Sequence, residues 1–215
     1  MIRLIEIGED NWLDFVGLYL PEEGTVLIGG KDTRAISLPA AVKNSSAVFQ
    51  KYARYKTTLG ENVRVSDLAG EKRSAAAPLS DADLPADSPC FPQGEETMLS
   101  REFDGVDLSG GQWQRVAIAR GLYRVHGLIV LDEPTAAIDP LEETRVYRKF
   151  AALSKNSTAV IVTHRMGSAR IADRIVVMKG GKIDDIGTHH ELMARGGAYA
   201  EMVAAQAEWY EAAEG

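Results

Sequence analysis

Two adjacent carboxylates, Asp132 and Glu133, close the apolar run LIVLDEP at residues 128–134. An ionised carboxylate is costly to bury without a partner, and two adjacent ones cost more. Neighbouring strand residues point to opposite faces, so the two side chains can take different roles. One can hold Mg²⁺, which prefers oxygen ligands, and the other can orient or deprotonate a water that attacks a phosphoryl group. Alternatively, the pair only marks the exit of the strand into solvent.

Two further polar residues, Gln50 and His164, stand at the ends of strand-like runs. SAVFQ covers residues 46–50, and TAVIVTH covers residues 158–164. In open parallel sheets, ligands bind beyond the carboxyl ends of the strands. We therefore expect both side chains to lie at the same sheet edge as the carboxylate pair, where they can handle phosphate or metal. Either residue alone is also compatible with an ordinary hydrogen-bonding role.

The stretch LSGGQWQRVAIAR at residues 108–120 predicts a helix whose start can bind an anion. Ser109 fits the N-cap position, and Gly110 and Gly111 leave backbone N–H groups open to close approach. Apolar residues recur behind them at helical spacing and predict a buried face. For an isolated SGG, a glycine-rich cap without a ligand is the alternative.

Alternating strands and helices are expected to position these residues. Strand-like apolar runs occur at residues 25–29, 46–50, 127–133, 158–164 and 174–180. Several are continuously apolar, as in parallel strands covered on both faces. Helix starts are predicted at Asp139 with Pro140, and at Thr188 with Glu191 in a capping box. A hairpin is predicted to turn at Gly180–Gly181. We expect an α/β fold with a mainly parallel sheet and flanking helices.

Residues 61–107 differ from the rest of the chain. They hold four of the eight prolines, many acidic residues and no long apolar run. This shift predicts an inserted helical subdomain rather than another layer of the sheet. The expected core is then formed by residues 1–60 and 108–215.

The composition limits the partners and the setting. The 215 residues are 45% hydrophobic and 26% charged, which suits one or two compact domains. The net charge of −7 argues against non-specific nucleic-acid binding. Cys90 is the single cysteine, so a disulfide framework is excluded and a reducing cytosol is expected. Because no apolar run is long enough to span a bilayer, we expect a cytoplasmic chain that reaches a membrane through a partner.

Taken together, five motifs resemble those of the nucleotide-binding domain of ABC transporters. VFQ (48–50) resembles the Q-loop, LSGGQ (108–112) the signature, LIVLDEP (128–134) the Walker B strand, AAID (136–139) the D-loop, and VTH (162–164) the switch histidine. They occur in the family's order, and the resemblance covers about nine-tenths of the chain, from Gly17 onward. It implies a P-loop NTPase-like fold and ATP with Mg²⁺ as cofactors.

The subtype is also visible in the sequence. Residues 163–203 are similar to the exporter branch, in which an HR pair follows the strand and a GTHxEL segment closes the domain. The DNA-repair ATPases that share the signature fit poorly. Those chains carry long coiled-coil insertions, whereas this one has no sustained heptads and no basic surface signal.

The resemblance implies roles for individual residues. In this family two domains form a head-to-tail dimer with ATP between them. Asp132 would hold Mg²⁺ through water, Glu133 would act as general base, and His164 would contact the γ-phosphate. Gln50 would sense the metal and the attacking water. Residues 61–107 would meet the membrane domains of the transporter, at the inner face of the cell membrane.

The same resemblance assigns residues to the partner's site. Ser109, Gly110, Gly111 and Gln112 would face the nucleotide held by the second domain, and Asp139 would cross the dimer interface. The implied partners are therefore a second nucleotide-binding domain and the transmembrane domains of an ABC transporter. No nucleic acid is expected.

The sequence departs from the family at the phosphate loop, which has the pattern G-x-x-x-x-G-K-[ST]. The family places this loop ahead of Gly17, where this chain has MIRLIEIGEDNWLDF. This stretch lacks Lys, and Glu9 and Asp10 would repel phosphate. GGKD at residues 29–32 fails on spacing and lacks the hydroxyl residue after Lys31; in the family's layout it is the turn of a hairpin. Residues 1–16 are thus atypical, and the N-terminal part of the core is expected to be incomplete.

Three explanations remain open. The chain is a truncated or frame-disrupted fragment of a larger exporter, which we favour. Or it is a non-catalytic half that donates its signature to a partner bearing a phosphate loop. Or it is a true ATPase with an unusual loop. The loss of a whole cradle of preorganised donors weighs against the third, since one donor alone contributes about 10²–10³ in rate.

Overall fold

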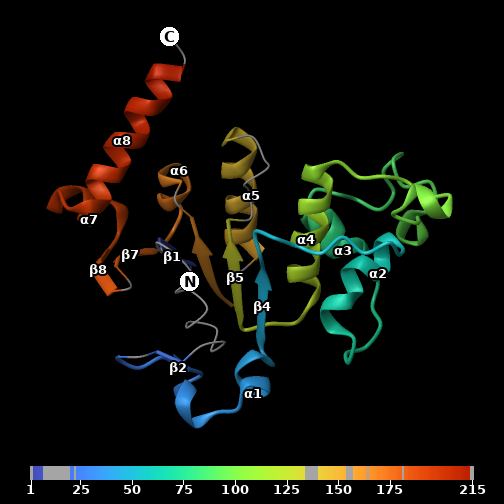
Figure 1. The fold of residues 1–215 in the computed structure, drawn as a ribbon, viewed down its shortest axis with the longest axis horizontal. Helices are drawn as coiled ribbons and strands as arrows, with labels where there is room; N and C mark the ends of the chain where they lie inside the picture. Colours follow the sequence, from blue (N-terminus) through green and yellow to red (C-terminus); the bar gives the residue numbers. More distant parts are fainter. Residues whose placement is uncertain are drawn as a thin grey trace.

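The computed structural model describes residues 2–6, 20–21, 23–133, 140–153, 157–163, 165–180 and 182–213. A six-stranded sheet with the order β4-β5-β6-β1-β7-β8 runs through the molecule (Figure 1). Its strands are β1 (Ile2–Glu6), β4 (Ser45–Val48), β5 (Leu128–Asp132), β6 (Thr158–Val162), β7 (Arg174–Lys179) and β8 (Lys182–Gly187). All neighbours pair in parallel except β7 and β8. The predicted α/β fold with a mainly parallel sheet is confirmed.

The first part of the chain forms a separate hairpin and adds one unpredicted strand to the main sheet. The run at residues 25–29 does not join the main sheet: β2 (Leu27–Ile28) pairs with β3 (Lys31–Asp32) in a separate hairpin. Gly29 and Gly30 make its turn with φ values of 57° and 79°, which glycine adopts without strain. A strand that the sequence did not predict, β1, lies between β6 and β7 instead. Its sequence, IRLIE, includes Arg3 and Glu6, so it lacks the continuous apolar character by which the other parallel strands were predicted.

The helices alternate with the strands in the second half of the chain. They are α1 (Leu38–Val42), α2 (Leu59–Arg64), α3 (Ala76–Asp81), α4 (Gly110–Tyr123), α5 (Pro140–Leu153), α6 (Met166–Ala169), α7 (His189–Arg195) and α8 (Ala198–Ala213). Single 3₁₀ turns cover Thr33–Ala35, Val65–Asp67, Gly94–Glu96 and Arg101–Phe103. Figure 1 shows α4 and α5 beside the sheet, and α2 and α3 beyond α4, away from the strands. No helix in the described segments combines the length and apolar character needed to cross a bilayer.

Several predicted element ends are confirmed. The Thr188 side chain accepts from the backbone of Glu191 in a capping box that starts α7, and Gly196 ends that helix with φ of 69°. Helix α5 begins at Pro140, while Asp139, its predicted N-cap, lies outside the described residues. The β7–β8 hairpin forms as predicted and includes Gly180 with φ of 58°; Gly181 lies outside the described residues.

The core fills both faces of the central strands. Ile129 and Ile161 belong to a buried cluster that also contains Val116 of α4. Val130 and Val160, which alternate with them, are buried in a second cluster. Burial on both faces is the arrangement expected of parallel strands, and it explains their continuous apolar sequence. These rigid strands hold the polar residues that follow them.

Candidate functional site

The carboxyl ends of β4 and β5 bring Gln50 and Glu133 together. The two strands are parallel neighbours, with Val48 paired to Leu131. Two residues beyond this pair, Gln50 Nε2 donates a hydrogen bond of 2.9 Å to Glu133 Oε2. The structure therefore brings together two of the residues that the sequence predicted at one sheet edge.

Glu133 leaves the strand through an unusual backbone conformation. Its φ is 41°, in the left-handed region that non-glycine residues rarely adopt. Its N–H still donates to Val162 O at 3.0 Å, so the residue stays attached to β6 while its side chain turns toward Gln50. This conformation costs on the order of 1 kcal/mol and is common where a side chain must be aimed for function.

Asp132 is the last residue of β5 and lies half-buried beside Glu133. Its backbone is paired with Val162 of β6, so its position is fixed by the centre of the sheet. Gln50 uses its side-chain nitrogen for the bond to Glu133. Its side-chain carbonyl oxygen is not used in that bond and can serve as an oxygen ligand. The pair of carboxylates and this amide oxygen are hard oxygen ligands at one strand end, so the donor set fits Mg²⁺.

This donor set is too small to hold a metal ion by itself. In the part of the chain that the structure describes, no three His, Cys, Asp or Glu side chains come close enough to form a metal site. Mg²⁺ commonly takes one or two carboxylates and fills its other positions with water and substrate phosphate oxygens. The arrangement thus suits a magnesium ion that arrives with a phosphate ligand.

The start of α4 forms the predicted cap. The Ser109 hydroxyl accepts from Gln112 N at 3.3 Å, and Gln112 Oε1 accepts from Ser109 N at 2.9 Å. Ser109 as N-cap is therefore confirmed, and the reciprocal bond makes a complete capping box. Since the hydroxyl accepts in this box, its own hydrogen remains available to donate to an anion.

The glycines of this cap leave the helix start open. A Cβ added at Gly110 or Gly111 would meet no heavy atom of the described structure within 4 Å. Further along, Trp113 and Val116 are buried and hold the helix on the core. The backbone at Gly110 and Gly111, at the start of a 14-residue helix, is thus open to the approach of a phosphate group.

A phosphate cradle of the phosphate-loop kind is not found in the described residues. The GGKD stretch forms the β2–β3 hairpin, with Lys31 and Asp32 in β3, as the family's layout implied. The stretch at residues 7–19, ahead of Gly17 and around it, lies outside the described residues. The full sequence contains no G-x-x-x-x-G-K-[ST] pattern. The residues present therefore fit the magnesium end of a nucleotide site and do not fit its phosphate loop.

Two predicted site residues, His164 and Asp139, lie outside the described residues. Next to His164, Thr163 is buried and its hydroxyl accepts from Arg165 N at 3.0 Å.

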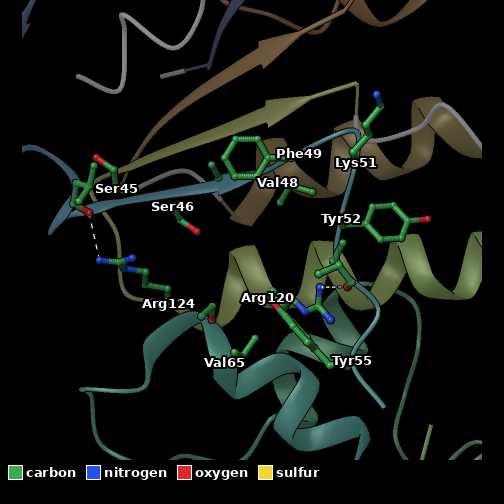
Figure 2. Close-up of a pocket in the computed structure, with 15 residues that line it drawn as sticks. Ser45, Ser46, Val48, Phe49, Lys51, Tyr52, Tyr55, Val65, Arg120 and Arg124 are labelled. Carbon is green, nitrogen blue, oxygen red and sulfur yellow. Dashed lines mark hydrogen bonds between the residues drawn. The ribbon is translucent and has the colours of Figure 1, made fainter. Parts of the chain in front are cut away.

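A cavity of about 490 Å³ opens beside the segment that follows β4 (Figure 2). Phe49 and Tyr55 on this segment are 42% and 44% exposed, so aromatic surface faces the opening. Arg120 of α4 lies in its wall and donates to Ala53 O at 2.6 Å. Burial away from water lowers the pKa of Arg120, with the nearby Tyr55 opposing this effect.

Sequence reasoning missed Tyr52, which contacts the start of α4. Its hydroxyl donates to Gly110 O at 3.1 Å, across 58 positions of sequence. No sequence signal indicates this contact, because it depends on how the segment after Gln50 packs against α4.

Known proteins with similar sequences belong to the family whose motifs form this candidate site. The family described as ABC transporter matches residues 14–136, more than half of the chain. The subtilin transport ATP-binding protein SpaT of Bacillus subtilis is 35% identical over 191 residues, covering 86% of this chain and 31% of its own length. The ATP-dependent lipid A-core flippase of Methylococcus capsulatus is 35% identical over 196 residues, covering 88% and 31%.

A solved structure has the same fold. A bacterial Atm1-family ABC exporter with ATP bound superposes with a TM-score of 0.82 and 28% identity, covering 96% of this chain and 36% of that one. The predicted P-loop NTPase-like fold is thereby confirmed. The chain spans about a third of the length of the relatives that it matches.

Proposed function

Because the chain belongs to the ABC transporter family, whose ATP-binding domains are ATPases, we propose that it is the nucleotide-binding part of an exporter and works as one half of a dimer. ATP and Mg²⁺ would bind at the interface between the two halves. The observation that carries this proposal is the hydrogen bond of 2.9 Å between Gln50 and Glu133 at the end of β5. It supports a Q-loop and a Walker B strand that act on the same reacting centre.

The acidic strand end would perform the chemistry. Asp132 and Gln50 would hold Mg²⁺, which neutralises negative charge on the phosphates when it is bound. Glu133, hydrogen-bonded by Gln50, would orient a water and accept its proton. His164 would contact the terminal phosphate.

The start of α4 would serve the partner's site. The Ser109 hydroxyl and the amides of Gly110 and Gly111 would donate to the terminal phosphate of a nucleotide held by the second domain, and Gln112 keeps the cap in shape. Asp139 would cross the interface.

The membrane partner would be the transmembrane domains of the transporter. Residues 61–107 are proposed as the helical subdomain that meets them. The exposed Phe49 and Tyr55 support contact at the cavity beside Gln50. The direction is proposed as export because the relatives include a flippase and the solved structure is an exporter.

A second candidate function is favoured by one observation, the lack of a G-x-x-x-x-G-K-[ST] pattern in the sequence. The chain would then be a non-catalytic half. It would complete a partner's ATP site with its signature without hydrolysing ATP at its own strand end.

Turnover of Mg²⁺–ATP by the purified chain separates the two candidates. Autonomous catalysis predicts phosphate release that Glu133→Gln lowers by about 10²-fold or more, since that residue would be the general base. If wild type releases no more phosphate than the Glu133→Gln control, autonomous catalysis is rejected and the signature-donor function is retained.

A further inference from the structure

The hydroxyl of Tyr52 contacts the start of α4 from the segment that follows Gln50. It donates to the carbonyl oxygen of Gly110, the first residue of α4 and part of the LSGGQ signature. A carbonyl oxygen has two lone pairs, so Gly110 can accept this bond in addition to one from its own helix. Tyr52 thus holds the backbone of the signature itself rather than a neighbouring side chain.

The other end of this connection is the catalytic strand end. Gln50 precedes Tyr52 by two residues, which separates their Cα atoms by roughly 7 Å at most. Gln50 is bonded to Glu133 at 2.9 Å. Two hydrogen bonds and the short backbone segment from Gln50 to Tyr52 therefore join Glu133 to Gly110.

The segment after Tyr52 is anchored to the same helix. Arg120 donates to Ala53 O at 2.6 Å, and to Asn62 O and Asn62 Oδ1 at 2.6 and 2.7 Å. Figure 2 shows Arg120 reaching from α4 toward this segment, beside the ring of Tyr55. Arg120 lies ten residues along α4 from Gly110, or about 15 Å. Because Ala53 is held there, movement of Gln50 is taken up within Lys51 and Tyr52.

We propose that Tyr52 is a positioning residue that couples the state of Gln50 at the magnesium end to the orientation of the signature at the start of α4. When the Gln50–Glu133 bond is formed, Tyr52 holds Gly110 in the orientation seen here. When that bond is lost, the hold on Gly110 weakens and the cap loosens. This inference deepens the proposed function, on which it rests for the role of the signature.

Hydrogen exchange measures the cap directly and needs no nucleotide. The amides of Gln112 and Trp113 both donate to Ser109, so their exchange rates report on the closed cap. The variants are Tyr52→Phe, which removes one hydroxyl and keeps the ring, and Gln50→Ala. The matched control is Tyr55→Phe, which removes a hydroxyl from the same segment; within the described residues that hydroxyl has no hydrogen-bond partner, and the ring remains on Arg120.

We expect Tyr52→Phe and Gln50→Ala each to speed exchange of the Gln112 and Trp113 amides roughly two- to tenfold, as expected for one lost hydrogen bond. The double variant should exchange no faster than Tyr52→Phe alone, because the effect of Gln50 passes through Tyr52. Tyr55→Phe should change nothing.

Two results would overturn the coupling. Either Gln50→Ala leaves exchange at the cap unchanged, or the two single effects multiply in the double variant. If Tyr52 only stabilises its own segment, one of these two results is expected. Because Gln50 is exposed, Gln50→Ala leaves the fold intact and its effect is readable by itself. Failure of ATP turnover leaves this test unaffected, so the two failures are distinguishable.

Discussion

Gln50 and Glu133 are 83 positions apart in the sequence, and a hydrogen bond of 2.9 Å joins their side chains. The bond forms because both residues leave the carboxyl ends of neighbouring parallel strands, and because Glu133 turns through a φ of 41°. One residue comes from each of two motifs, so this contact links the proposed Q-loop to the proposed Walker B strand.

Gly111→Ala should separate function from stability. The new methyl group meets no atom of the described structure within 4 Å, and alanine favours a helix by up to about 1 kcal/mol over glycine. Thermal unfolding should therefore show an unchanged or slightly raised midpoint. Turnover at a shared site should fall by about a hundredfold, since the methyl blocks phosphate from the amides. Unchanged turnover with Gly111→Ala would show that the signature is not part of the ATP site.

Gly121→Ala, in the same helix, should behave in the opposite way. Its added Cβ would lie 2.5 Å from Val48 Cγ2 and 3.5 Å from Ile129 Cδ1, and valine cannot move aside easily. We expect the free energy of unfolding to fall by about 1–3 kcal/mol despite the gain in helix propensity. Urea unfolding measures this, with Gly111→Ala as the matched control. Equal stability of the two variants would contradict the packing of α4 on β4.

Arg120→Lys should destabilise the protein although it keeps the charge. The guanidinium donates to Asn62 O and Oδ1 at 2.6 and 2.7 Å, and Asn62 is fully buried. A lysine ammonium cannot reproduce this planar fork, so we expect a loss of about 1–3 kcal/mol in the free energy of unfolding. Arg54→Lys is the control, since Arg54 is exposed and lies 5.9 Å from the ring of Tyr52. A loss that is equal in both variants would show that the fork is not needed.

Low pH should reduce the free energy of unfolding through protonation of Glu95. Burial raises the pKa of this carboxyl, but bonds from Ser74, Ala75 and Arg64, with the charge of Arg64, outweigh it and lower the pKa below 4.5. Because the folded pKa is the lower one, the stabilisation is present above pH 4.5 and is lost as the pH falls through the folded value.

Glu95→Gln should therefore flatten the dependence of unfolding free energy on pH below that value. Glu96→Gln is the control, because the Glu96 side chain is 73% exposed and 3.8 Å from Arg64. Parallel acid profiles for wild type and Glu95→Gln would show that the ion pair of Arg64 and Glu95 does not contribute.

Local patterns predicted the parts of this structure that depend on few residues. The caps at Ser109 and Thr188 follow from side-chain chemistry within one helical turn. The meeting of Gln50 with the carboxylate pair was predictable too, because parallel strands end at the same edge.

Contacts that depend on tertiary packing could not be predicted. The run at residues 25–29 has the apolar character of a strand, but whether it joins the main sheet depends on which strand occupies the neighbouring position. The bond from Tyr52 to Gly110 crosses 58 positions and has no periodic signal. The sequence of α4 likewise does not indicate that Arg120 donates to three acceptors, which belong to Ala53 and Asn62.

The central claim is that the signature of this chain completes an ATP site of a second nucleotide-binding domain. It is tested most directly by mixing the chain with a domain that carries a phosphate loop but has arginine in place of its own signature serine. Phosphate release from Mg²⁺–ATP is then measured with wild type, Ser109→Arg and Glu133→Gln. In this mixture the only intact site combines the partner's phosphate loop with Ser109 of this chain. We predict that wild type restores turnover, that Glu133→Gln retains it, and that Ser109→Arg lowers it by about a hundredfold or more. Equal turnover with wild type and Ser109→Arg would contradict the claim.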